Sequence, residues 1–176
     1  MNLKYEVLDT SGDISICKDL CNELMHFQKS VAHIEPQLFD NMNFDTRMIP
    51  SIKNATYNYI IMVKDDENPI GYVYSNISPK KAYSNEFATF FDMNSVTQSH
   101  VGCLSQFYIK EDYRDYGIGT KLFNMSMEWL DTFNNINDIF IFVSNGNNDA
   151  LKFYQNKGYV YSHDILKGFI SVLRNK

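Results

Sequence analysis

The sequence predicts an α/β fold in which helices pack against a mixed sheet. Segments rich in β-branched and aromatic residues alternate with segments whose apolar residues recur at helical spacing. A strand-like run, a glycine turn and a helical pattern also follow one another directly between Val101 and Trp129. With 176 residues, 44% of them hydrophobic, the chain can bury a core beneath such layers. We therefore expect one domain that spans residues 1–176.

In the first half of the chain, alternating and helical hydrophobic patterns predict a strand, two helices and an antiparallel hairpin. These elements are a strand at residues 4–8, a helix from 13 to about 29, a shorter helix at 38–47 and strands at 57–63 and 70–77. Pro50 is expected to close the second helical region. Residues 78–99 carry aromatic side chains among polar ones, which fits either a loop with a short helix or an added strand.

In the second half, strands and helices are expected to alternate. The elements are a strand at 101–109, a helix from the glycine turn to about 133, a strand at 139–143, a helix at 147–156 and strands at 159–162 and 169–173. Residues 139–143 are uninterrupted apolar residues, which is typical of an interior strand. We expect this strand to lie parallel to the strand at 101–109, joined to it by a right-handed crossover.

Charge and composition narrow the class of protein. The formal net charge is −5, which disfavours a nucleic-acid partner because phosphate attraction needs a basic face. No apolar run approaches the roughly 20 residues that span a bilayer, and the first residues lack a signal-peptide core. We expect a soluble, cytoplasmic protein without a membrane partner.

The cysteines and histidines do not predict a metal site. Cys17 and Cys21 share one helix face, Cys103 lies far along the chain, and the four histidines show no ligand-like spacing. We expect these residues to be structural and the protein to need no metal.

A glycine turn before a helix is the feature that most resembles a binding site. It reads Arg114-x-x-Gly117-x-Gly119 and leads directly into a helical pattern. The first amides of a helix have no intrahelical acceptor, and the helix dipole favours an anion beside them. Glycine also removes the Cβ that would hold a phosphate away from the backbone. The pattern lacks the third glycine of a dinucleotide fingerprint and the Gly-Lys-Ser/Thr of a P-loop, and glycines before a helix are more often plain turn or capping residues.

Two motifs together resemble the GNAT family of N-acetyltransferases. The glycine turn is similar to the family's Gln/Arg-x-x-Gly-x-Gly/Ala loop, which binds the pyrophosphate of acyl-CoA. A second motif resembles the family's Asn-x-x-Ala-x-x-Leu/Phe-Tyr followed by Gly-Phe, and it reads Asn147-x-x-Ala150-x-x-Phe153-Tyr154 and then Gly158-Tyr159. The motifs occur in the family's order, separated by a helix and a strand, and they cover residues 104–159.

The resemblance implies the acyl-CoA N-acyltransferase fold, a mostly antiparallel twisted sheet with one splayed parallel pair and flanking helices. Acetyl-CoA would lie with its pantetheine arm in the splay and its pyrophosphate on the amides of the glycine turn. The implied cofactor-binding residues are Phe107, Tyr108, Ile109, Arg114, Asp115, Tyr116, Gly117, Ile118, Gly119, Thr120, Lys121, Asn147 and Tyr154.

The resemblance also implies a reaction, the transfer of an acetyl group to a primary amine by direct attack in a ternary complex. Tyr154 stands where the family places its catalytic acid, although a core tyrosine is the alternative. The amine would belong to a small molecule or to a protein N-terminus or lysine. A non-catalytic acyl-CoA-binding module is the alternative function. The implied partners are acetyl-CoA and the amine, for a monomer or a homodimer.

The sequence does not identify the general base. Many relatives carry a glutamate on the central strand, where this chain has Cys103, Ser105 and Gln106. A water chain through Ser105 is one possibility. Other candidates lie in the two segments expected to form the acceptor pocket, residues 30–50 and 78–99, and they are His33, Glu35, Asp40, Glu86 and Asp92. Glu111 and Asp112 are expected to be solvated.

Overall fold

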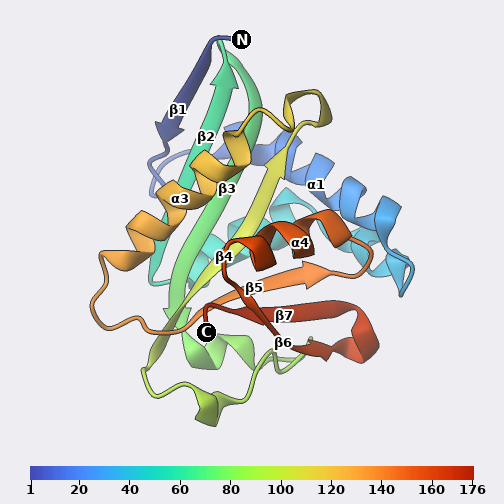
Figure 1. The fold of residues 1–176 in the computed structure, drawn as a ribbon, viewed down its shortest axis with the longest axis vertical. Coiled ribbons are helices and arrows are strands. Elements are labelled where there is room, and N and C mark those ends of the chain that lie inside the picture. Colours follow the sequence, from blue (N-terminus) through green and yellow to red (C-terminus); the bar gives the residue numbers. More distant parts are fainter.

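A computed structural model describes residues 1–176 and places all seven strands in one sheet, with helices on both faces (Figure 1). The strand order is β1-β2-β3-β4-β5-β7-β6. The strands are β1 (Leu3–Val7), β2 (Tyr57–Asp65), β3 (Asn68–Pro79), β4 (His100–Ile109), β5 (Ile139–Ser144), β6 (Val160–Ile165) and β7 (Ile170–Arg174). Every neighbouring pair is antiparallel except β4 with β5, which is parallel. The predicted mixed and mostly antiparallel sheet is confirmed.

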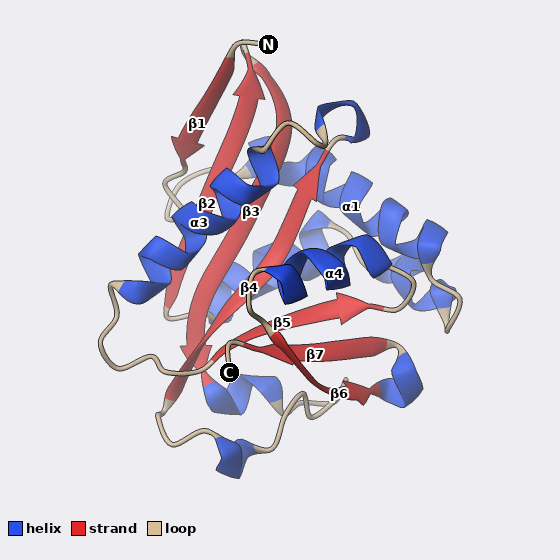
Figure 2. Ribbon diagram, in the orientation of Figure 1, coloured by secondary structure: helices blue, strands red, loops and turns tan.

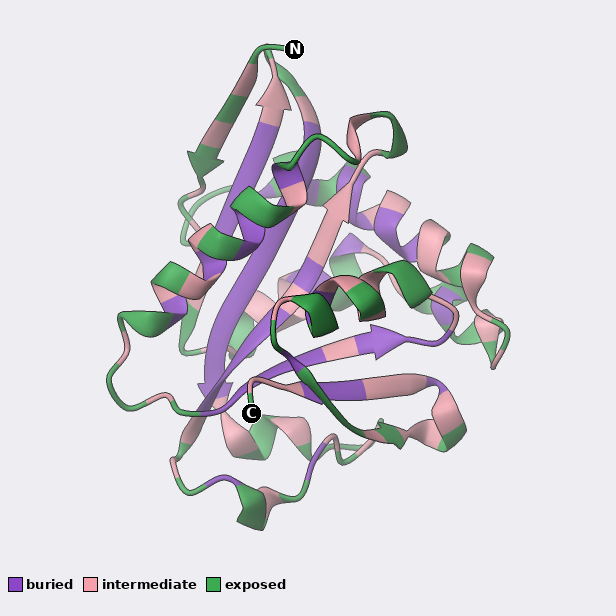
Figure 3. Ribbon diagram, in the orientation of Figure 1, coloured by how far each residue is buried: buried purple, intermediate pink, exposed green.

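The helices form two layers around the sheet (Figure 2). α1 (Lys18–Val31) and α2 (Ile49–Asn54) cover one face, and α3 (Ile118–Asp131) and α4 (Asn148–Asn156) cover the other. A separate apolar cluster underlies each layer, and the middle residues of the central strands between them are buried (Figure 3). No helix of the structure has the length and apolar character needed to cross a membrane.

The segment after α1 differs from the prediction of one helix over residues 38–47. Residues Pro36–Asn41 form a 3-10 helix and Phe44–Met48 a π-helical turn, and α2 follows. Pro50 therefore lies in the first turn of a helix and does not end one, because a proline is tolerated where the N–H has no intrahelical acceptor. Residues 78–99 form neither a full helix nor a strand, but two 3-10 turns, Lys80–Tyr83 and Met93–Ser95.

The parallel pair separates soon after it forms. Residues Gly102 to Leu104 of β4 pair with β5, and beyond Leu104 the two strands have no further register partners. At this point β4 contains a bulge, since Ser75 faces Leu104 and Tyr74 faces Gln106, which leaves Ser105 without a partner. The bulge turns Gln106 toward α1 while Leu104 packs under α3. From Ser105 to Ile109 the edge of β4 that faces β5 is therefore open.

Candidate functional site

Two cavities lie along the open edge of β4. The larger, of about 590 Å³, extends to the turn before α3 and is called the cradle cavity after residues 114–120 of that turn. The smaller, of about 340 Å³, is called the side cavity and is lined by Arg47, Tyr83 and Phe142 among others. Phe107, Asn147 and Tyr154 line both, so the cavities meet at these side chains.

The cradle cavity presents free backbone amides to any bound group. α3 begins at Ile118. The N-cap residue, Gly117, has a φ of 79°, and no side chain caps the helix. The amide groups of residues 115–120 donate to no acceptor in the protein, and the first bond of this region runs from the Lys121 amide to the Gly117 carbonyl. Amides of this kind at a helix N-terminus fit an anion such as a diphosphate.

Gly119 has no side chain and so leaves the space above the amides of the cradle cavity open. A Cβ at this position would lie 3.5 Å from Ile109 and 3.8 Å from both Phe107 and Phe153, so the space beside it is bounded by apolar side chains. A methyl group would fit there, whereas a large side chain would fill the cavity that lies above the amides.

Ten of the thirteen expected cofactor-binding residues line the cradle cavity, namely Phe107, Tyr108, Ile109, Arg114, Asp115, Gly117, Gly119, Thr120, Asn147 and Tyr154. The other three point elsewhere. Ile118 is a core residue, Tyr116 is exposed, and the Lys121 ammonium lies 4.0 Å from the centre of the Tyr5 ring on β1. Tyr116 and Ile118 contribute only their backbone to the turn beside the cradle cavity.

Of the two cations that the sequence indicated, Arg114 lines the cradle cavity and Lys121 does not, and a third cation, Lys157, lies beside Thr120. The Arg114 Nε donates to the Ile109 carbonyl at 2.9 Å, and its guanidinium lies over the Phe27 ring. The Lys157 ammonium, from the end of α4, donates to the Thr120 hydroxyl at 3.2 Å and was not predicted. Its position depends on how α4 packs beside α3, which no local motif encodes.

Tyr154 stands at the junction of the two cavities. Its ring is 6% exposed and packs against Phe107, Phe123 and Phe153. Its hydroxyl forms no hydrogen bond within the protein. Burial raises the pKa of Tyr154 above its ordinary value of 10.0, so the phenol stays protonated at neutral pH. Asn147 beside it caps α4, because its Oδ1 accepts from the Ala150 amide.

The side cavity is assembled from segments far apart in the chain. Its walls come from α1, residues 42–54, residues 76–90, β4 and the end of β5, and 18 of the 31 lining residues are hydrophobic. Two polar groups in the wall lack partners, the Asn76 Oδ1 and the Ser144 Oγ, although both residues are more than nine-tenths buried. The Asn76 Nδ2 donates to the Tyr74 hydroxyl at 3.0 Å, which leaves the Oδ1 as a free acceptor.

The side cavity contains no residue that could act as a strong base. No Asp, Glu or His lines it, and the candidates His33, Glu35, Asp40, Glu86 and Asp92 all lie outside both cavities. Asp40 pairs with Lys29, and Asp92 caps a 3-10 turn. Burial raises the pKa of the Cys103 thiol to about 12, so this group is neutral. Ser105 is the candidate that does line the cavity.

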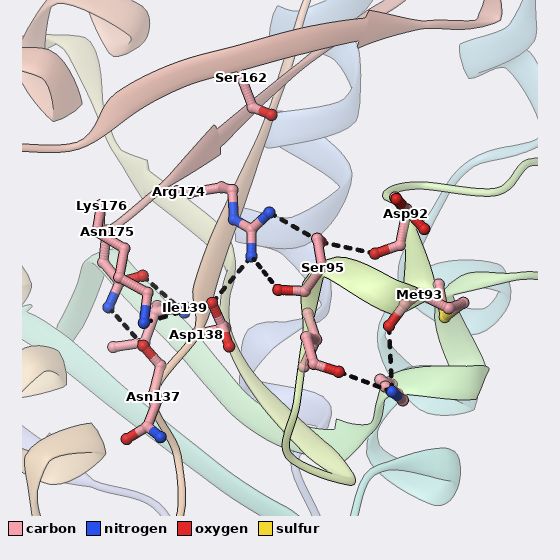
Figure 4. A network of polar contacts seen from close by, with 12 residues as sticks. Asp92, Met93, Ser95, Asn137, Asp138, Ile139, Ser162, Arg174, Asn175 and Lys176 are labelled. Carbon is pink, nitrogen blue, oxygen red and sulfur yellow. Dashed lines mark hydrogen bonds and ion pairs between the residues drawn. The ribbon is translucent and has the colours of Figure 1, made fainter.

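Residues 78–99, which supply part of the side-cavity wall, are fixed to the C-terminal strand (Figure 4). Arg174 of β7 forms an ion pair with the buried Asp138 at 2.9 Å and donates to the Ser95 hydroxyl at 2.9 Å. Lys80 donates to the carbonyls of Met93 and Val96. These contacts hold an otherwise irregular segment in place.

Asn145 fixes the part of the side cavity where the end of β5 meets the end of α1. Its Oδ1 accepts from the amides of His33 and Ile34, both at 2.8 Å, and its Nδ2 donates to the carbonyls of Ile34 and Phe169. Gly146 follows with a φ of 82°, and a Cβ there would lie 1.9 Å from the Val31 carbonyl. The end of β5 is thus joined closely to the end of α1.

Comparison with known proteins identifies the class that this fold and site define. The chain matches the Acetyltransferase (GNAT) family over residues 20–159. The protein belongs to this family and is a GNAT-type N-acetyltransferase, as its two motifs indicated. No curated protein matches the chain by sequence.

Solved structures of similar fold include several acetyltransferases. The PaiA N-acetyltransferase from Thermoplasma acidophilum, in complex with coenzyme A, aligns with a TM-score of 0.68 at 14% identity over 100% of this chain and 99% of that chain. Arabidopsis thaliana NAA60 with acetyl-CoA gives 0.61 at 16% identity, over 98% and 97%. The NatC complex bound to Gag peptide and CoA gives 0.54 at 14% identity, over 99% and 96%. At such identities the likeness establishes the fold.

Proposed function

We propose that this protein transfers the acetyl group of acetyl-CoA to a primary amine by direct attack within a ternary complex. The observation that carries the proposal is the meeting of the two cavities at Tyr154, beside the open edge of β4. A long, phosphate-bearing substrate fits the cradle cavity, and an amine can reach the same point through the side cavity.

Backbone groups would hold acetyl-CoA. The free amides of residues 115–120 receive the diphosphate, and the open edge of β4 offers hydrogen-bonding groups to the pantetheine arm. Lys157 and Thr120 add a cation and a hydroxyl near the phosphates. The solved structures of PaiA with coenzyme A and NAA60 with acetyl-CoA support this assignment.

Groups of the protein would remove the proton of the amine and stabilise the reacting carbonyl. When bound, acetyl-CoA supplies an acyl thioester that a neutral amine can attack. An alkylammonium has a pKa of about 10.4 and must lose a proton first. Since the side cavity lacks a carboxylate, we assign this proton to water relayed through Ser105. An unpaired N–H on the β4 edge stabilises the charge that develops on the carbonyl oxygen.

Tyr154 assists the departure of the sulfur. A thiol has an ordinary pKa near 8.5, below that of a buried phenol, so complete proton transfer from Tyr154 is uphill. Its hydroxyl instead acts as a fixed hydrogen-bond donor that stabilises the thiolate as it leaves.

A thiol-release assay tests the proposal. The protein is mixed with acetyl-CoA and a panel of amines that includes amino acids, polyamines, amino sugars and N-terminal peptides, and free CoA is measured. We expect release with at least one amine, and thermal stabilisation by acetyl-CoA of about 2.7 kcal/mol at 100 times Kd. Stabilisation without release for any amine would instead identify an acyl-CoA-binding module. If acetyl-CoA does not stabilise the protein and no amine releases CoA, both functions are contradicted.

A further inference from the structure

Arg47 enters the side cavity from a backbone that is held rigidly. It belongs to the π-helical turn Phe44–Met48, in which Asn43 and Thr46 cap each other through their side chains. Phe44 and Met48 on the same turn are buried in the core. Arg47 is an exposed residue that lines the cavity, and partial desolvation by the surrounding walls lowers the pKa of its guanidinium.

The Arg47 guanidinium has no partner in the protein. It forms no ion pair or hydrogen bond, whereas Arg174 binds Asp138 and Ser95 and Arg114 binds a backbone carbonyl (Figure 4). It is also the only charged group among the 31 residues that line the side cavity.

Nothing nearby compensates the charge of Arg47. The two thiols that interact with it electrostatically are Cys21 and Cys103. Burial raises the pKa of these thiols to about 11 and about 12, so both are neutral at neutral pH. An arginine stays charged in a protein, so the side cavity contains one positive charge that no group of the protein balances. Such a site is complementary to an anion from outside the protein.

The remaining wall indicates what else the occupant carries. Aromatic side chains form much of it, and they are Phe39, Tyr83, Phe90, Phe142 and Phe169. A cavity of about 340 Å³ accepts a small molecule.

We propose that the acceptor is a small primary amine with one carboxylate and an apolar body, as in an apolar or aromatic amino acid, and that Arg47 binds the carboxylate. This proposal rests on the proposed acetyl transfer. Guanidinium and carboxylate match in charge and geometry and can form two parallel hydrogen bonds. A polyamine or an aminoglycoside would bring further ammonium groups to a cavity whose only charge is positive, where like charges repel.

The test compares amino acids with their own amides, in which a neutral carboxamide replaces the carboxylate. We measure kcat/KM by thiol release for alanine, methionine, phenylalanine and tryptophan and for the four amides. The wild-type protein should favour the best acid over its amide by about 10- to 100-fold, as expected for a charge-assisted pair.

Variants then assign that preference to one side chain. Arg47→Gln should abolish the preference while kcat/KM for the amide changes by no more than about 2-fold, and Arg47→Lys should retain part of it. The matched control is Lys53→Gln, which removes one positive charge from the neighbouring α2 outside the cavity and should leave the preference intact. Circular dichroism confirms that each variant is folded.

Three results would overturn the proposal: equal rates for acids and amides, a preference that survives Arg47→Gln, or faster acetylation of a polyamine or an amidated peptide. If no amine releases CoA, the proposed acetyl transfer itself fails. The carboxylate site is then tested by calorimetry on the CoA-saturated protein, with N-acetylphenylalanine against N-acetylphenethylamine. Equal affinity for these two ligands would reject the role of Arg47.

Discussion

The two cavities meet at one tyrosine but are built in different ways. The cradle cavity presents unpaired backbone amides of consecutive residues, 115–120, which a single glycine turn exposes. The side cavity is formed by side chains from segments that are distant in the sequence, such as Arg47, Asn76 and Phe142. A backbone site allows side chains to vary and preserves one ligand class, whereas a side-chain site defines the ligand through the particular residues present. This difference predicts distinct responses to substitution.

The largest effect is expected in the cradle cavity. Gly119→Trp should fill the space above the free amides and weaken acetyl-CoA binding by more than about 100-fold, because a rigid indole would occupy the position of the ligand. Isothermal titration calorimetry measures the affinity. Gly12→Trp, in an exposed turn, is the control and should bind normally. Unchanged affinity in Gly119→Trp would place the cofactor elsewhere.

Asn145→Ala should affect the side cavity and spare the cradle. It removes three hydrogen bonds to His33 and Ile34 after α1 and one to the Phe169 carbonyl, so we expect a loss of about 2–4 kcal/mol in the free energy of unfolding. Urea denaturation measures this loss.

Asn135→Ala is the control for Asn145→Ala, because Asn135 is exposed and should contribute less than about 0.5 kcal/mol. Acetyl-CoA affinity of the folded Asn145→Ala protein should stay within about 2-fold, since the cradle amides are untouched. A large loss of affinity would show that the two cavities are not built independently.

Tyr154→Phe tests the role of the hydroxyl that lies where the two cavities meet. Loss of the hydroxyl should lower kcat by about 10- to 100-fold and leave acetyl-CoA affinity nearly unchanged, because the donor acts on the leaving sulfur. Tyr159→Phe removes a hydroxyl that contacts the Met127 sulfur outside both cavities, and it should be close to wild type. Full activity of Tyr154→Phe would make Tyr154 a core residue.

The same contrast explains what the sequence could predict. The element order, the mixed sheet and the glycine turn follow from local patterns, since hydrophobic periodicity and glycine positions act over a few residues. The side cavity depends on how distant segments pack. Arg47 belongs to a turn expected to be an ordinary helix, and the base candidates Glu35 and Asp92 line neither cavity. Lys157 also reaches the cradle only through tertiary packing.

The smallest effect is expected for Lys157→Met. Lys157 is partly exposed and solvent screens its charge, so acetyl-CoA affinity should fall by only about 2- to 5-fold. The loss should shrink at higher salt. Lys152→Met, elsewhere on the exposed face of α4, should have no effect at either salt concentration. A salt-independent loss would indicate a structural role for Lys157.

A crystal structure of the complex with acetyl-CoA tests most directly whether the two cavities form one site. We expect the diphosphate on the amides of residues 115–120 and the thioester where the two cavities meet, within reach of the Tyr154 hydroxyl. A diphosphate bound away from these amides, or a thioester that does not reach Tyr154, would contradict this expectation.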